Sequence, residues 1–190
     1  MEEQGIIFIS GGVRSGKSSF AEELAAKLAC DSNAQLHYIA SGQASDPEMS
    51  ERISRHIKDR ERSGLNWTTW EQPRDLARLA PCFSKNDVVL LDCLTTLLNN
   101  EFFRGTWQEH SFPEDVVSSI IEAVRQIADS CNSLILVSNE VAHEPLVGNE
   151  LVFCYVSALG SLHQKIVSIA SEAFLVESGV PLMMKGAMKR

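Results

Sequence analysis

The sequence predicts an α/β fold in which a mostly parallel sheet is flanked by helices. Short apolar runs alternate along the chain with longer segments of helical periodicity, which is the order expected of strand-helix-strand units. Two of these runs, residues 88–91 and 134–137, are continuously apolar, as in strands that are buried on both faces of a sheet. The chain has 190 residues and no repeat or linker-like tract, so we expect residues 1–190 to form a single domain.

Seven segments are predicted to be strands. They are residues 6–10, 35–40, 67–71, 88–91, 134–137, 173–176 and 180–184. The first strand is rich in isoleucine and ends in Gly11 and Gly12, which indicates that it runs into a glycine turn. The last two strands lie on either side of Ser178 and Gly179.

Helices are predicted between the strands. The segment after the glycine turn carries Phe20, Leu24 and Leu28 on one stripe, as an amphipathic helix does. Residues 113–127 begin with Pro-Glu-Asp, which suits the positive N-terminus of a helix. Residues 151–170 also have the apolar periodicity of a helix.

Acidic residues outnumber basic ones. There are 25 Asp and Glu against 17 Lys and Arg, which gives a formal net charge of −8. This balance argues against a nucleic-acid partner, because broad attraction to phosphate backbones requires a basic surface. The net charge does not exclude a binding site for a single anion.

Residues 48–62 follow Asp46 and Pro47, a pair typical of a helix start, and are expected to form a highly charged helix or an ordered lid.

The cysteines and the N-terminus predict the compartment. The five cysteines are scattered and show no C-x-x-C spacing, which indicates neither a disulfide framework nor a zinc site. The N-terminal sequence lacks the basic region and the cleavage site of a signal peptide. We also expect that no apolar run is long enough to span a bilayer. We therefore expect a cytoplasmic protein without a membrane span.

The most informative motif lies between the first strand and the first helix. Its sequence satisfies the pattern G-x-x-x-x-G-K-[ST] with Gly11, Gly12, Val13, Arg14, Ser15, Gly16, Lys17 and Ser18. In such a loop the backbone N–H groups surround phosphates, the lysine contacts the β- and γ-phosphates, and the serine hydroxyl binds Mg²⁺. We therefore predict a P-loop NTPase-like (RecA-like) fold that uses GTP or ATP as substrate and Mg²⁺ as cofactor.

A magnesium carboxylate is expected at the end of a neighbouring strand. Asp92 follows the buried run 88–91 and is the candidate for the Walker-B position. Its alternative role is to cap the helix that begins near Thr95. Glu140 is a second strand-end carboxylate, for which a functional and a structural role remain equally open.

The phosphate loop and several motifs later in the chain resemble those of a known family. The chain resembles, nearly end to end, the bifunctional adenosylcobinamide kinase/adenosylcobinamide-phosphate guanylyltransferase of cobalamin biosynthesis. The matching residues, besides the phosphate loop, are Phe20–Glu22, Tyr38–Ala40, Asp46–Met49, Arg52, Ile53, His56, Trp67–Thr69, Glu71, Leu91–Thr96, Val137–Val141, Gly160, Gln164, Ser178 and Gly179.

The resemblance implies two reactions on one nucleotide scaffold. A nucleoside triphosphate first phosphorylates the hydroxyl of adenosylcobinamide, a corrinoid, and GTP then donates GMP to that phosphate through a GMP-histidine intermediate. His56 is the histidine that matches the family motif. A neutral imidazole is a good nucleophile near pH 7, which suits that role. Its alternative is an incidental histidine on a solvated, charged helix face.

The resemblance also implies nucleotide contacts and an assembly state. Ser41, Gly42, Gln43 and Glu71 match segments that contact the guanine nucleotide, and a carboxylate such as that of Glu71 can accept hydrogen bonds from guanine N1 and N2. The same resemblance implies a homo-oligomer, and specifically a homotrimer.

The late helix departs from the family pattern. Where family members carry arginines, an aspartate and an asparagine, this chain has Glu150, Phe153, Val156, Ser157, Ser161 and His163. Ala142, His143 and Glu144 also replace a glycine-rich stretch. Two alternatives to the bifunctional enzyme therefore remain open. One is a P-loop kinase for another small alcohol, and the other is a GTP-responsive binding module without catalysis.

Overall fold

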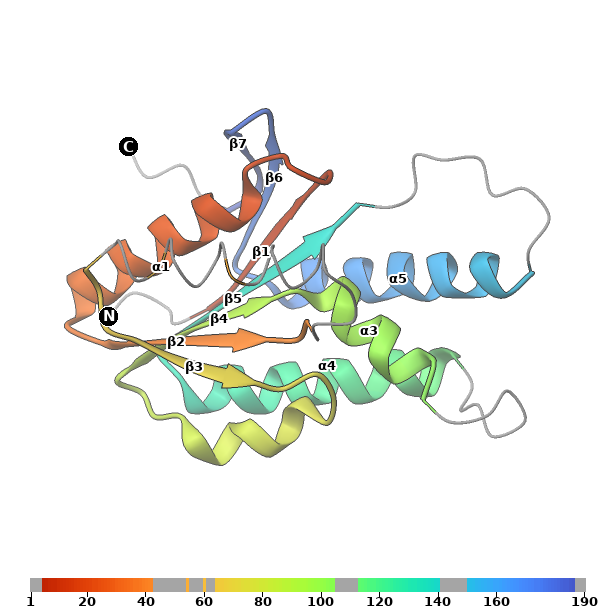
Figure 1. Cartoon of the computed structure of the whole chain (residues 1–190), viewed down its shortest axis with the longest axis horizontal. Helices are drawn as coiled ribbons and strands as arrows, with labels where there is room; N and C mark the ends of the chain where they lie inside the picture. Colours follow the sequence, from red (N-terminus) through yellow and green to blue (C-terminus); the bar gives the residue numbers. More distant parts are fainter. Residues whose placement is uncertain are drawn as a thin grey trace.

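Figure 1 shows the computed structural model, which describes residues 5–42, 54, 60, 64–104, 113–140 and 150–186. Seven strands form one sheet. Their bounds are β1 Ile6–Gly11, β2 Gln35–Ala40, β3 Trp67–Glu71, β4 Asp87–Asp92, β5 Ser133–Asn139, β6 Glu172–Glu177 and β7 Val180–Lys185. Each of the seven segments predicted to be a strand is one, with ends that differ by at most two residues. The continuously apolar runs are the central strands β4 and β5, as expected for strands covered on both faces.

The sheet is mostly parallel. Its strand order is β3-β2-β4-β5-β1-β6-β7, and all neighbouring pairs are parallel except β6 and β7. The chain therefore crosses over the sheet repeatedly, so that the C-terminal ends of β1, β2, β4 and β5 lie along one edge. In parallel sheets this is the edge where ligands bind.

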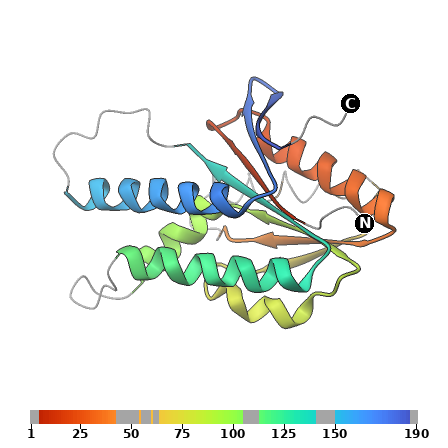
Figure 2. The same ribbon diagram turned by 180° about the vertical axis from the view of Figure 1, so that it is seen from behind.

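Helices cover both faces of the sheet (Figures 1 and 2). Their bounds are α1 Lys17–Ser32, α3 Leu94–Phe102, α4 Pro113–Ser130 and α5 Glu150–Ile169, with a 3₁₀ helix, η1, at Leu76–Cys82. The prediction of helices at residues 113–127 and 151–170 is confirmed. η1 was not predicted, because it is short and contains Pro81, and no helical periodicity precedes it. Most of the expected helix at residues 48–62 lies outside the described residues, of which Ser54 and Arg60 are helical.

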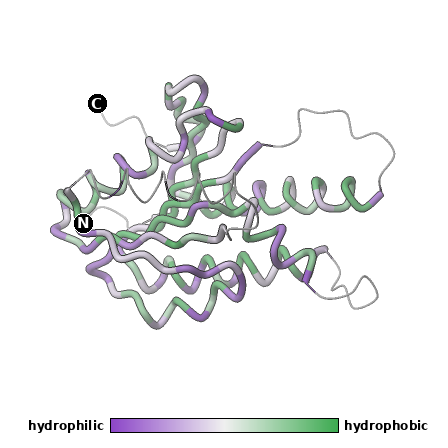
Figure 3. Tube along the Cα trace, in the orientation of Figure 1, coloured by the Kyte–Doolittle hydropathy of each residue, from purple (hydrophilic) through white to green (hydrophobic). Residues whose placement is uncertain are grey.

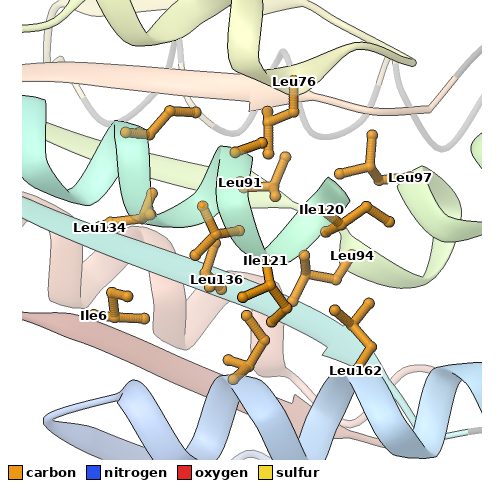
Figure 4. Packing of buried hydrophobic residues seen from close by; sticks show 14 of the residues in the cluster. Ile6, Leu76, Leu91, Leu94, Leu97, Ile120, Ile121, Leu134, Leu136 and Leu162 are labelled. Atoms are coloured by element: carbon orange, nitrogen blue, oxygen red, sulfur yellow. The ribbon is translucent and has the colours of Figure 1, made fainter. Parts of the chain in front are cut away.

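Two hydrophobic cores lie on opposite faces of the sheet. The larger core joins η1, α3, α4 and α5 to the sheet, and Figure 4 shows its leucines and isoleucines interdigitated. The smaller core lies under α1, whose buried apolar residues are Ala21, Ala25 and Ala29. The expected stripe of Phe20, Leu24 and Leu28 is therefore displaced by one position. The alanines allow α1 to approach the sheet closely, and the larger side chains pack at the flank.

Helix α5 requires a correction to the sequence analysis. Its 20 residues are long and apolar enough to cross a membrane by length and composition, contrary to the expectation that no such run exists. However, Ala158, Leu159, Leu162 and Ile166 pack into the larger core, so the second half of α5 is a core helix. Its N-terminal half extends beyond the sheet and is coloured as hydrophobic in Figure 3, and there Phe153 is 62% exposed.

Candidate functional site

Three neighbouring strand ends define the candidate site. β4, β5 and β1 are adjacent and parallel, and they end at Asp92, Asn139 and Gly11. The backbone N–H of Glu140 donates to the carbonyl oxygen of Gly11 at 3.1 Å, which joins the end of β5 to the start of the phosphate loop. The sheet topology therefore places the phosphate loop and the two predicted strand-end carboxylates on one edge.

The phosphate loop has a backbone that only certain residues allow. Gly16 has φ 92° and Arg14 has φ 61°, both in the left-handed region, where glycine is the least strained residue. The N–H of Ser15 donates to the carbonyl oxygen of Gly12 at 3.2 Å, which closes the turn. At Gly11 an added Cβ would collide with the carbonyl oxygen of Val176 and would lie 2.6 Å from Ser15 Oγ. Gly11 and Gly16 thus fulfil separate steric requirements, one for a close approach and one for a positive φ.

The loop opens into the N-terminus of α1. Gly16 is the N-cap, and no side chain caps the helix, so the first-turn N–H groups are not satisfied by a capping side chain. Lys17 is only 3% exposed and its Nζ donates to the carbonyl oxygen of Gly12 at 2.9 Å, which holds the ammonium group across the loop. The hydroxyl of Ser15 is buried and has no hydrogen-bond partner among the described residues. Uncapped N–H groups, a buried ammonium and an unpartnered hydroxyl suit a phosphate group.

The C-terminal hairpin braces the loop from outside. The N–H of Gly179 donates to the carbonyl oxygen of Ser15 at 2.8 Å. Gly179 and Ser178 both have positive φ, which turns the chain from β6 into β7 at this point. An added Cβ on Gly16 would lie 3.1 Å from Gly179 Cα, so the two turns pack backbone against backbone. The turn was predicted from Ser178 and Gly179, but its contact with the loop was not, because that contact depends on β1 and β6 being neighbours.

Asp92 lies at the end of β4 as predicted, and its carboxylate is half-buried. Its oxygen Oδ2 accepts a hydrogen bond from the hydroxyl of Tyr38 at 3.2 Å. The following helix, α3, has Cys93 as its N-cap and no side-chain capping bond, so the alternative role of Asp92 as a helix cap is not observed. Burial, together with the negative charge of Asp92, raises the pKa of Tyr38 well above its usual value, so its hydroxyl keeps its proton.

Glu140 lies beside the loop, where Ser10 Oγ donates to its Oε1 at 3.3 Å. Behind it, a chain of hydroxyls joins three elements. Thr95 Oγ1 is 2.9 Å from Ser138 Oγ, and Ser138 Oγ is 2.7 Å from His163 Nε2 on α5. Burial lowers the pKa of His163, although the nearby charge of Glu140 opposes this effect. The sequence pattern did not single out His163 as a functional residue, and the structure places it directly behind the site.

The residues expected to contact the guanine nucleotide differ in how deeply they are buried. Ser41 is fully buried, and its Oγ both donates to the carbonyl oxygen and accepts from the N–H of Cys93, each at 2.8 Å. Gly42 follows it and is half-buried. Glu71 is exposed at the end of the edge strand β3, opposite Ala40 in the register. Gln43 and His56 lie outside the described residues.

The donor set suits Mg²⁺. Ser18 is the second residue of α1 and Asp92 ends β4, and both supply hard oxygen ligands. Mg²⁺ typically uses only one or two protein oxygens together with waters and substrate phosphates. No group of three or more His, Cys, Asp or Glu that could hold a metal ion occurs among the described residues.

A cavity of about 840 Å³ lies elsewhere, between η1, α3 and α4. Leu97, Phe102 and Ile120 contribute apolar surface to it. Arg104 lies at the cavity and pairs with Asp75 at 2.9 Å. Because it is separate from the phosphate loop, we do not include it in the nucleotide site.

Comparison with known proteins gives one consistent result. Residues 7–184 match the family described as CobU, cobinamide kinase / cobinamide phosphate guanyltransferase. The chain is 30% identical over 189 residues to the bifunctional adenosylcobalamin biosynthesis protein CobU of Escherichia coli, covering 95% of this chain and 99% of that protein. It is 35% identical over 179 residues to the bifunctional adenosylcobalamin biosynthesis protein CobP of Pseudomonas aeruginosa, covering 94% and 96%.

Solved structures show the fold alone. The KaiC-like protein PH0186 of Pyrococcus horikoshii matches with a TM-score of 0.55 at 11% identity, covering 99% of this chain and 82% of that one. The flagellar accessory protein FlaH of Methanocaldococcus jannaschii matches with a TM-score of 0.53 at 16% identity, covering 97% and 80%. These neighbours confirm the predicted P-loop, RecA-like fold class.

Proposed function

The chain belongs to the CobU family and is a bifunctional cobinamide kinase and cobinamide phosphate guanylyltransferase of adenosylcobalamin biosynthesis, and from that premise we propose which residues carry its two reactions. The observation that supports the assignment best is the phosphate loop. Its buried Lys17 and uncapped helix N-terminus lie on the same sheet edge as Asp92. The predicted alternatives, a kinase for another alcohol and a binding module, are disfavoured by membership of this family.

For the kinase step, we assign triphosphate binding to the loop from Gly11 to Ser18. The first-turn N–H groups of α1 and the ammonium of Lys17 hold the β- and γ-phosphates and neutralise the charge that develops during transfer. The corrinoid hydroxyl attacks the γ-phosphorus, and the bond from that phosphorus to the β-γ bridging oxygen breaks. The products are cobinamide phosphate and a nucleoside diphosphate.

The kinase step is proposed to use Mg²⁺ as cofactor. Ser18 Oγ and the carboxylate of Asp92 would hold the cation, because one begins α1 at the loop and the other ends β4 on the same edge. When bound, Mg²⁺ supplies charge neutralisation on the phosphate oxygens. Asp92 remains available for this role because its observed partner is a tyrosine hydroxyl, which donates to the carboxylate and does not neutralise it.

For the guanylyltransferase step, we assign His56 as the nucleophile. The imidazole attacks the α-phosphorus of GTP and pyrophosphate leaves, and the phosphate of cobinamide phosphate then displaces the histidine to give the GDP-linked corrinoid. Support comes from the sequence motif alone. Glu71 is our candidate for recognising guanine, and its exposed carboxylate at the end of β3 is accessible to a base. Ser41, Gly42 and Gln43 are the further proposed contacts, with the hydroxyl of Ser41 engaged by Cys93.

A cytoplasmic location and a homo-oligomer, specifically a trimer, complete the proposal. A corrinoid and a nucleotide are its substrates, and we propose no nucleic-acid partner, because the net charge is −8.

The GMP-enzyme adduct tests the assignment of His56. Protein incubated with α-³²P-labelled GTP and Mg²⁺ should carry a label that is labile in acid and stable in base, as a phosphoramidate is. The label should be absent in His56→Ala and present in His163→Gln, which alters a histidine on α5 instead. Labelled His56→Ala would contradict the assignment of His56, and an unlabelled wild-type protein would contradict the covalent mechanism.

A further inference from the structure

Tyr38 is a buried residue close to the phosphate edge that the two reactions do not explain. It lies on β2, is 4% exposed, and its hydroxyl donates to Asp92 Oδ2 at 3.2 Å. In the β2–β4 register Tyr38 is opposite Leu90, two residues before Asp92. Residues two apart on a strand point to the same face, so the long side chain of Tyr38 reaches along that face to the strand end.

The ring of Tyr38 is fixed on two further sides. Trp67 of β3 packs against it edge-to-face, with ring centroids 6.2 Å apart. The guanidinium carbon of Arg60 lies 3.6 Å from the ring centroid, within the range of a cation–π contact. Arg60 is itself buried and pairs with Glu22 of α1, Nη1 to Oε1, at 3.6 Å. With its ring held by Trp67 and Arg60, the Tyr38 hydroxyl has a fixed position from which to donate.

A single hydrogen bond to one carboxylate oxygen has a directional consequence. A carboxylate that accepts at Oδ2 has one rotamer favoured over the others, and its second oxygen, Oδ1, is the one that the tyrosine does not engage. Partners that orient a metal ligand in this way commonly change metal affinity when they are removed. Asp92 is half-buried at the strand end, and its bond from Tyr38 restricts the orientation of its side chain.

We propose that Tyr38 is a positioning residue for phosphoryl transfer, whose hydroxyl orients the Asp92 carboxylate toward the Mg²⁺-nucleotide complex while Trp67 and Arg60 hold its ring in place. The proposal rests on the assignment of Asp92 as the magnesium carboxylate. Tyr38 itself touches neither the nucleotide nor the cation in this account.

The test uses Mn²⁺ as a spectroscopic probe that replaces Mg²⁺ at its proposed site. Mn²⁺ affinity is titrated by electron paramagnetic resonance in the presence of a non-hydrolysable GTP analogue. Tyr38→Phe keeps the ring and removes the hydroxyl, so Mn²⁺ should bind about 10-fold more weakly. The matched control is Tyr155→Phe, which removes a hydroxyl that donates to the carbonyl oxygen of Thr95 at 3.0 Å, and which should leave Mn²⁺ affinity unchanged.

Asp92→Asn separates this proposal from the one on which it rests. If Asp92→Asn binds Mn²⁺ as the wild type does, the magnesium assignment itself fails. If Asp92→Asn loses Mn²⁺ affinity and Tyr38→Phe does not, only the role of Tyr38 is overturned. A drop in affinity in Tyr38→Phe that Tyr155→Phe matches would also overturn it, because the effect would then be general destabilisation.

A second measurement does not depend on whether Tyr38→Phe folds. The chain contains two tyrosines, so protein labelled with 3-fluorotyrosine gives two ¹⁹F resonances, and Tyr155→Phe identifies both. The Tyr38 resonance should shift in Asp92→Asn and on addition of Mg²⁺ with the GTP analogue, whereas the Tyr155 resonance should not. A Tyr38 resonance that is unchanged in both cases would contradict the proposal.

Discussion

The phosphate end of the sheet and the N-terminal half of α5 differ in how far their functional or apolar side chains are exposed to solvent. At the phosphate end, Lys17 is 3% exposed and the loop is closed by backbone hydrogen bonds to Gly12 and Gly179. In the first turns of α5, Val152 and Phe153 are 41% and 62% exposed. The phosphate loop is thus held by contacts within the described fold, whereas the first turns of α5 present apolar side chains to solvent.

Lys17→Ala is the change with the largest expected effect. It removes the ammonium that lies across the loop and would meet the β- and γ-phosphates. We expect kcat/KM of the kinase step to fall about 1,000-fold, since removing a preorganised charge from a transferring phosphoryl group commonly costs 10²–10³ or more. Kinase rates with saturating corrinoid check this, and Lys27→Ala, on the exposed side of α1, is the control. Retention of wild-type activity in Lys17→Ala would contradict the assignment of the loop.

Leu162→Ala tests the buried half of α5. Leu162 is fully buried in the larger core, and truncating such a leucine leaves a cavity. We expect the free energy of unfolding to fall by about 3 kcal/mol. Urea denaturation followed by circular dichroism measures this loss, and a loss below about 1 kcal/mol would show that α5 is not docked on the sheet as described.

Acidification should destabilise the protein partly through His163. Because burial lowers the pKa of His163 in the folded state, the unfolded chain binds a proton at this residue more readily. Stability is therefore unaffected above the unfolded pKa of about 6.5 and decreases as the pH falls from there toward the folded pKa, by at most about 1.4 kcal/mol per pH unit. Denaturation at pH 7.5 and 5.5 checks this. His163→Gln should show a smaller loss, and an equal loss in both proteins would contradict the stated cause.

Phe153→Ser should have the smallest effect on stability. Its ring is mostly exposed, so we expect the free energy of unfolding of the monomer to change by less than about 0.5 kcal/mol. Light scattering measures the mass of the assembly formed by the wild type and by the variant. If the chain assembles through this half of α5, the variant should have a lower mass than the wild type, and an unchanged oligomer would exclude Phe153 from the interface.

The fold was largely predictable because its signals are local. Continuous apolar runs mark the buried strands β4 and β5, and the sequence from Gly11 to Ser18 specifies a strand, a turn and a helix N-terminus by itself. The buried stripe of α1 was misplaced by one position. The sequence shows that leucines and phenylalanine recur at helical spacing, but it does not show that the sheet lies close enough to require the alanines.

The positions of the candidate site residues were predictable where a local signal marks them. The phosphate loop has its motif, and Asp92 is a candidate because a carboxylate directly follows a buried strand. The contacts of Tyr38 with Asp92, of Gly179 with Ser15, and of Ser138 with His163 join residues that are 54, 164 and 25 positions apart in the chain. Such contacts depend on the strand order, and no spacing in the sequence contains that order. The roles of all the candidate site residues stay predictions, from the phosphate loop and Asp92 to His56, Glu71 and Gln43.

The most direct test of the central claim, that one nucleotide scaffold carries both reactions, uses two labels in one reaction. Wild-type protein is incubated with adenosylcobinamide, γ-³³P-labelled ATP and GTP, and α-³²P-labelled GTP, and the corrinoid product is isolated. The account predicts that this product carries both labels in a one-to-one ratio, because one phosphate comes from each reaction. A corrinoid that carries the γ-label alone, or neither label, would contradict it.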